Sequence, residues 1–167
     1  SGAPQVNLST GTGGGTLAVT DELSGDFGGL LEASDAVEAY AADLDTWVDN
    51  FGAAFNTQHS AGFDSTGAAG GDFFSFTAGA EAITFAVDAT LLADPALLAA
   101  AGAATAAAGD GDNLELMLDV ESQALHAGAT RTTGEALSDI YASVGRDLEN
   151  MKLDQQTFYL QLDDLRA

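Results

Sequence analysis

The sequence predicts a mainly helical α+β protein, an elongated antiparallel bundle of three helices, one of them long, with a small β annex. Two periodic patterns support this. Apolar residues at steps of three and four run from Leu30 to Gln58, and apolar residues repeat every seven from Glu135 to Arg166. Between these segments, Gly-rich and Ala-rich stretches and two short alternating runs interrupt helix formation.

The composition excludes several classes of protein. The 167 residues hold 4 Lys and Arg against 26 Asp and Glu, a formal net charge of −22, and no Cys. Nucleic-acid binding needs clustered cations, and disulfides and thiolate metal sites need cysteine, so none of these is expected. No apolar run reaches 18 residues, so we expect no membrane span. The charge excess indicates salty or extracellular surroundings.

The N-terminal half is predicted to contain a β/loop segment and one helix. Residues 1–29 are rich in Gly, Ser and Thr, and the alternation of Leu17 and Val19 predicts a short strand there. The helix predicted over 30–58 places acidic residues on the faces away from its apolar stripe. Gly52 within it costs about 1 kcal/mol relative to Ala.

Residues 60–111 are predicted to form an annex inserted between the helices. A Gly-rich loop over 60–71 precedes two predicted strands, 72–77 and 82–87, which residues 78–81 join as a hairpin. Phe73, Phe74 and Phe76 are expected to pack against the helices. A short helical turn is expected over 90–93, whereas the conformation of the Ala-rich residues 96–108 is left open.

The C-terminal part is predicted to complete the bundle, whose domain comprises 30–59 and 112–167. A second helix is expected over 114–126, and the heptad pattern predicts a long final helix over 135–166. We expect the core to form between one set of residues on each long helix: Leu44, Trp47, Val48, Phe51 and Phe55 against Val144, Leu148, Met151 and Phe158.

No pattern in the sequence predicts catalysis, a cofactor or a metal. His59 and His126 lack metal-ligand spacing, and neither a nucleophile elbow nor a phosphate loop is present. His59 is expected to end a helix, where a charged imidazolium suits the helix dipole. Two alternatives stay open: an extracellular acidic calcium- or ligand-binding module using Asp64 and Asp72, and an acidic hydrolase domain from a halophile.

One set of residues forms a more specific pattern, which begins the first helix and continues through the loop after it. Its members are Gly29, Leu30, Leu31, Asp35, Asn56, His59, Gly62, Asp64, Gly67, Gly71, Phe73 and Phe74. The pattern resembles the middle region of the flagellar hook-associated protein 1 (FlgK) family, the hook–filament junction proteins. Ser34 and Ser65 depart from it, where the family has Arg and Leu. Residues 110–166, with Leu137–Gly145, are similar to the family's downstream region.

The resemblance implies a structural protein of the bacterial flagellum that acts through contacts between subunits. The implied partners are other copies in a ring, the hook protein, the second junction protein and an export chaperone that binds a C-terminal region outside this chain. The implied location is extracellular, after export by the flagellar type III route. The chain would then be a middle-to-C-terminal fragment.

Overall fold

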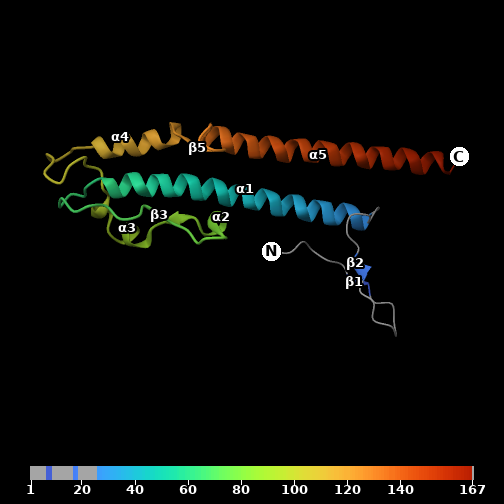
Figure 1. The fold of residues 1–167 in the computed structure, drawn as a ribbon, viewed down its shortest axis with the longest axis horizontal. Helices are drawn as coiled ribbons and strands as arrows, with labels where there is room; N and C mark the ends of the chain where they lie inside the picture. Colours follow the sequence, from blue (N-terminus) through green and yellow to red (C-terminus); the bar gives the residue numbers. More distant parts are fainter. Residues whose placement is uncertain (1–6, 9–16, 19–25, 167) are drawn as a thin grey trace. The chain divides into compact units, whose positions relative to one another are not determined.

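The computed structural model describes residues 7–8, 17–18 and 26–166, which divide into two compact units, 1–42 and 43–167. In the first unit, β1 (Asn7–Leu8) pairs antiparallel with β2 (Leu17–Ala18), with Leu8 opposite Leu17. β2 falls within the predicted strand, whereas Val19 lies outside the described residues. Helix α1 (Asp26–Ala61) begins in this unit, four residues before the predicted start (Figure 1).

In the second unit, the residues of α1 from 43 onward lie between two layers (Figure 1). One layer holds the loops, short strands and short helices of residues 62–111, and the other holds α4 (Asp112–Asp119), β5 (Ala124–His126) and α5 (Thr133–Asp164). Gln58 bonds to Asn113 of α4, and Trp47 bonds to Thr133 of α5. The second layer therefore runs antiparallel to this part of α1. The mainly α fold with a small β part is confirmed.

Gly52 is explained by a close contact in this unit. The glycine is buried inside α1, and a Cβ at its position would lie 2.6 Å from the ring of Phe76. Glycine destabilises the helix at this position, but it leaves the space that the Phe76 ring of the annex occupies.

The predicted hairpin of the annex is present in a shorter form. β3 (Phe74–Ser75) pairs antiparallel with β4 (Ala86–Val87). The strand predicted over 82–87 is wrong in its first part, because α2 (Glu81–Thr84) forms a helical turn there. The Asp45 carboxylate accepts from Ala82 N–H at 2.7 Å, and the Thr84 hydroxyl donates to the Ala80 carbonyl at 2.6 Å. These two hydrogen bonds stabilise a helical turn where the alternation of apolar residues predicts a strand. The side chain of Ile83 is 88% exposed.

Two aspartates begin the short helices that follow. Asp88 caps α3 (Ala89–Ala93), which agrees with the helical turn expected there, and Asp94 caps the 3₁₀ helix η1 (Pro95–Leu97). Residues 98–108 are not helical. Instead, Ala101 exchanges two backbone hydrogen bonds with Phe63, which answers the question left open for the Ala-rich stretch.

The helix predicted over 114–126 is wrong beyond Asp119. The chain continues as the 3₁₀ helix η2 (Val120–Ser122) and then β5, which pairs antiparallel with β6 (Arg131–Thr132). Ala127, Gly128 and Ala129 have φ angles of 49°, 68° and 63°, so three consecutive left-handed residues reverse the chain. Nothing in the residue types marks Ala127 and Ala129 for that conformation.

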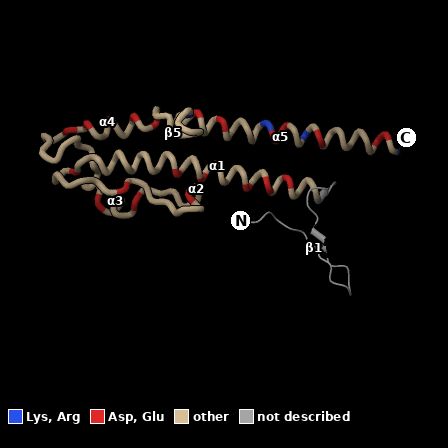
Figure 2. The backbone as a smooth tube through the Cα atoms, in the orientation of Figure 1, with Lys and Arg blue, Asp and Glu red and all other residues tan. Residues whose placement is uncertain are grey.

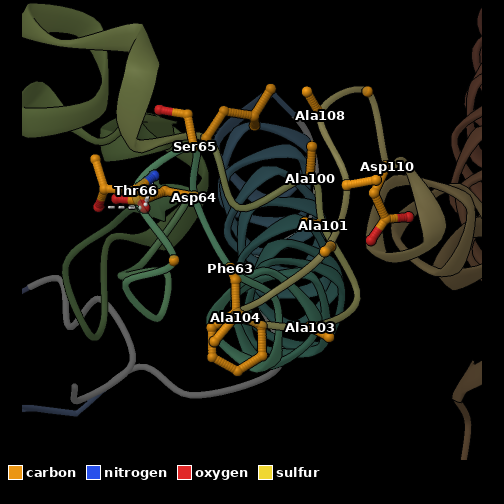
Figure 3. Close-up of a pocket in the computed structure, with 15 residues that line it drawn as sticks. Phe63, Asp64, Ser65, Thr66, Ala100, Ala101, Ala103, Ala104, Ala108 and Asp110 are labelled. Carbon is orange, nitrogen blue, oxygen red and sulfur yellow. Dashed lines mark hydrogen bonds between the residues drawn. The ribbon is translucent and has the colours of Figure 1, made fainter.

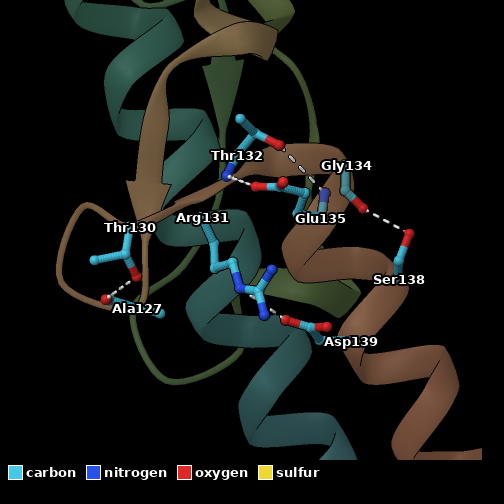
Figure 4. A network of polar contacts seen from close by, with 8 residues as sticks. All are labelled: Ala127, Thr130, Arg131, Thr132, Gly134, Glu135, Ser138 and Asp139. Carbon is cyan, nitrogen blue, oxygen red and sulfur yellow. Dashed lines mark hydrogen bonds and ion pairs between the residues drawn. The ribbon is translucent and has the colours of Figure 1, made fainter.

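Helix α5 begins where local side chains satisfy its first N–H groups. Thr132 and Glu135 form a capping box, and Arg131 Nε lies 3.3 Å from the Asp139 carboxylate (Figure 4).

Among the described residues, the buried apolar side chains are Val48, Leu91, Ala99, Met117 and Val120. Within the part of the chain described, no helix is long and apolar enough to cross a bilayer.

The core predicted between the two long helices differs from the packing found. Trp47 lies beside Thr133, in the first turn of α5, while Phe51 and Phe55 contact Phe74 of the annex. Of the proposed set, Val48 is buried, and Trp47, Phe51, Phe55 and Val144 are half-buried. Leu44, Leu148, Met151 and Phe158 are exposed in this chain, by 37%, 54%, 38% and 50%.

Candidate functional site

The motif residues from Asn56 to Phe74 meet at the C-terminal end of α1. Asn56 reaches from the helix to the β3 segment: its amide nitrogen donates to the Phe74 carbonyl at 2.8 Å. Its carbonyl oxygen accepts from Phe73 N–H at 2.9 Å and from Phe74 N–H at 2.8 Å. One side chain of α1 therefore satisfies three backbone groups of Phe73 and Phe74, which follow the loop.

His59 joins two further segments to the helix. The ring is 1% exposed; Nδ1 donates to the Gly71 carbonyl at 2.8 Å, and Nε2 accepts from Ala99 N–H at 3.0 Å. A carbonyl cannot donate and a backbone N–H cannot accept, so the imidazole is neutral with its proton on Nδ1. The expectation of a charged imidazolium at the helix end is wrong, because the ring is buried and both nitrogens are used by backbone groups.

Asp64 closes the loop that follows α1. One carboxylate oxygen accepts from Thr66 N–H at 2.7 Å, from the Thr66 hydroxyl at 2.7 Å and from Ala68 N–H at 3.0 Å. The hydroxyl of Thr66, followed by its backbone N–H, holds the pKa of this carboxyl below its ordinary value. The aspartate is thus a turn-forming residue whose charge is satisfied within its own loop.

Three glycines of this loop lie where a side chain would collide or strain the backbone. A Cβ on Gly62 would overlap the Asn113 amide, and one on Gly70 would lie 2.5 Å from the His59 carbonyl. Gly67 has a φ of 81°, which favours glycine. The motif glycine Gly71 is different, since a Cβ there would meet no atom within 4 Å. What Gly71 contributes is the carbonyl that His59 binds.

Asn113 of α4 is the partner of this loop, a role that was not predicted from the sequence. Asn113 is 2% exposed, donates to the Ala99 carbonyl at 2.6 Å and accepts from Gln58 Nε2 at 2.7 Å. Its only signal in the sequence was its place at the start of a predicted helix. Together, His59 and Asn113 hold both backbone polar groups of Ala99.

Phe73 and Phe74 carry the apolar side of the same cluster. The Phe74 ring centroid lies 4.5 Å from that of Phe85, 4.7 Å from Phe73 and 5.1 Å from Phe55. These rings pack between α1 and the annex, as expected for the Phe73–Phe76 run. The other motif residues, Gly29, Leu30, Leu31 and Asp35, lie in the first turns of α1 in the other unit, where Leu30 is 66% exposed.

A cavity of about 550 Å³ adjoins the loop (Figure 3). It is lined by residues 63–67 and by the Ala-rich stretch up to Asp110. Asp110 accepts from the backbone N–H groups of Asp112 and Gly102, which lower its pKa, so its carboxylate, like that of Asp64, serves its own loop. No cluster of three or more potential metal ligands occurs among the described residues. The calcium alternative on Asp64 and Asp72 stays a prediction.

His126 lies in a second polar cluster, at the joint between α1, the β5–β6 hairpin and α5. It is 5% exposed and stacks on Trp47 with 6.3 Å between ring centroids. Its Nδ1 lies 3.5 Å from the Asn50 amide nitrogen, and its Nε2 has no partner. Burial lowers its pKa, which keeps the ring neutral.

Asn56 and His59 hold backbone segments together, as does Trp47 at the joint beside His126. Residues 1–74 match the family model for the flagellar hook-associated protein FlgK helical domain. Over these residues the chain is similar to the FlgK helical domain. The match includes every motif residue from Gly29 to Phe74, so the predicted family is confirmed over that stretch. No curated protein matches the chain.

The boundary of the FlgK match has a structural consequence. His59 and Gly62 lie inside the match. Their neighbours lie outside it: Ala99 donates to the His59 ring, and the Asn113 amide lies against Gly62. The end of the FlgK segment is thus held by the part of the chain that follows it. The resemblance of Leu137–Gly145 to the family's downstream region lies beyond the match and stays a prediction.

Proposed function

We propose that this protein is a structural component of the bacterial flagellum that acts at the junction between hook and filament. Contacts between subunits would be its function, and it would catalyse no reaction. The observation that carries the proposal is the FlgK helical-domain match, which contains the motif residues Asn56, His59 and Asp64. Each of these uses its polar atoms to fix a loop.

The arrangement of polar groups favours a scaffold over an active site. A general base or nucleophile needs a reactive atom that a substrate can approach. In His59 both ring nitrogens are bonded to backbone groups in the interior, and the bonded oxygen of Asp64 has three donors. The same residues give rigidity to the end of a 36-residue helix.

The proposed partners follow from the flagellar assignment. They are further copies of the chain arranged in a ring, the hook protein, the second junction protein and an export chaperone. The proposed location is outside the cell in the flagellum, reached by the flagellar type III export route.

Sedimentation with isolated hooks tests the junction role. Purified chain is mixed with hooks from the source organism and centrifuged, with filaments freed of hooks as the control. We expect saturable sedimentation with hooks, because a junction protein must recognise the end of the hook lattice. A chain that stays in the supernatant at all hook concentrations, or that sediments equally with filament shafts, would contradict the proposal.

A further inference from the structure

His126 is a buried histidine whose ring has no neighbour placed to accept a second proton. The ring is 5% exposed, and its Nε2 has no hydrogen-bond partner among the described residues. Its Nδ1 lies 3.5 Å from the amide nitrogen of Asn50, which can donate a hydrogen bond but cannot accept one. The neutral ring therefore accepts at Nδ1 and carries its proton on Nε2.

A second proton on this ring would create two unfavourable contacts. The new N–H at Nδ1 would face the N–H groups of the Asn50 amide, and the N–H at Nε2 would still lack an acceptor. Turning the Asn50 amide would relieve the first contact and leave the second. A charged ring in the interior also loses its hydration, so the imidazolium is favoured only where the ring reaches water.

The charged groups near the ring come from several elements. Asp43 of α1, Arg131 of β6 and Asp139 of α5 line a cavity of about 290 Å³ together with the ring, and Glu121 of η2 lines a separate cavity. Arg131 pairs with Asp139, and Asp43 is exposed. Acidic residues recur along α1 and α5 (Figure 2). An imidazolium that reaches the surface here is therefore stabilised by an excess of carboxylates.

The β5–β6 hairpin that carries His126 is weakly held by its own backbone. Its strands have three and two residues, and Ala127 and Ala129 in the turn are left-handed, a conformation that residues with a Cβ rarely adopt (Figure 4). Trp47 of α1 stacks on the His126 ring and donates to the Thr133 carbonyl, so it joins α1 to the hairpin and to the first turn of α5. The charge state of His126 acts directly on these contacts.

We propose that protonation of His126 opens this joint, so that the β5–β6 hairpin and the first turn of α5 separate from Trp47 while the loop held by His59 stays closed. The closed form holds the neutral ring, and the open form holds the imidazolium. Protonation of His59 would instead have to break the bond that its Nε2 accepts from Ala99 N–H. The inference goes beyond the proposed flagellar function and does not depend on it.

Amide hydrogen exchange of the full chain tests the opening. Protection factors, each relative to the unstructured rate at the same pH, are measured at pH 7.5 and 5.5 for peptides that cover residues 124–137 and 53–74. An exposed histidine with a pKa of about 6.5 is roughly nine-tenths protonated at pH 5.5, so protection over 124–137 should fall by up to about tenfold. Protection that is the same at both pH values would overturn the proposal.

Urea separates local opening from unfolding of the whole chain. Local opening exposes little surface, so at pH 5.5 protection over 124–137 should be lower than over 53–74 and should change little up to about 1 M urea. Equal protection of the two segments with the same steep dependence on urea would show that the joint opens only when the chain unfolds, and would overturn the proposal.

Two neutral variants identify the titrating group. His126→Phe keeps a ring beside Trp47 and cannot take up a proton, so its protection over 124–137 should be the same at both pH values. His126→Gln is a second neutral variant without a ring, and circular dichroism at pH 7.5 verifies that each variant is folded. A fall in protection that persists in the folded variants would assign the titration to another group and refute the proposal.

Discussion

At the scale of single residues, the polar motif side chains of this protein bind backbone groups of neighbouring segments and hold these segments together. His59 and Asn113 together satisfy the N–H and the carbonyl of Ala99, a residue that is 0% exposed. Buried backbone groups without partners destabilise a fold, so each such side chain stabilises a segment that has no regular secondary structure. This explains why a histidine and two amide side chains occur together at the C-terminal end of α1.

Removing the His59 ring should cost stability. His59→Ala leaves the Gly71 carbonyl and the Ala99 N–H without partners, so we expect a loss of about 3 kcal/mol in the free energy of unfolding, measured by urea titration. Ser60→Ala, which removes an exposed bond to the Thr57 carbonyl, is the control and should change it by less than about 0.5 kcal/mol. Equal effects would mean that the ring does not hold the loop.

Two motif glycines should respond differently to the same substitution. Gly62→Ala forces a methyl group onto the Asn113 amide and should destabilise the protein by about 2 kcal/mol or more. Gly71→Ala meets no atom within 4 Å and should stay within about 0.5 kcal/mol of the wild type. Thermal unfolding of both variants gives the comparison. A harmless Gly62→Ala would place α4 farther from the loop than described.

At the scale of elements, the joint at Trp47 determines how α5 departs from α1. Trp47 Nε1 donates to the Thr133 carbonyl at 2.9 Å and its ring stacks on His126, so one side chain contacts both the hairpin and the first turn of α5. The capping box of Thr132 and Glu135 then begins the helix at that point. The direction of α5 in this unit depends on these contacts.

The buried His126 should make the joint sensitive to mild acid. Its pKa is lowered by burial in the folded state, so between that value and the ordinary value of about 6.5 the unfolded chain binds more protons. The stability present above pH 6.5 should therefore fall as the pH falls below it. Urea titrations followed by the fluorescence of Trp47, from pH 7.5 to 5.5, measure this slope. His126→Gln should flatten it, and an unchanged slope in that variant would assign the titration to another group.

At the scale of the whole molecule, the charge imbalance is the dominant feature. With 26 acidic against 4 basic side chains, most carboxylates have no cation to pair with, and the ion pair Arg131–Asp139 is half exposed on both sides. Such an exposed ion pair contributes little to the stability of the fold. Repulsion among the excess carboxylates therefore destabilises the folded chain.

Salt should therefore stabilise the protein. Raising NaCl from about 0.05 to 0.5 M shortens the screening length and should raise Tm by about 3 °C or more. The control is the same series near the isoelectric point of about 4.1, where the net charge vanishes and the rise should disappear. A Tm that falls with salt at pH 7 would show that attractive pairs outweigh the repulsion.

Patterns confined to one segment were predictable. The stripe that marks α1, the heptads of α5 and the aspartates that begin α3 and η1 are local, because apolar spacing and capping act within a few residues. The site was predicted in part: Asn56, His59 and Asp64 were identified as a set, but the neutral state of His59 was not.

The amino-acid sequence by itself determined the two long helices, the acidic surface and the FlgK motif, because periodicity, charge and short-range capping need no distant partner. Only the tertiary structure decided that Glu81–Thr84 coils instead of extending, that the chain turns back at Ala127–Ala129, and that Trp47 faces Thr133. The turn at Glu81–Thr84 and the position of Trp47 depend on hydrogen bonds between residues far apart along the chain, and the left-handed Ala127 and Ala129 adopt a conformation that their residue type does not favour.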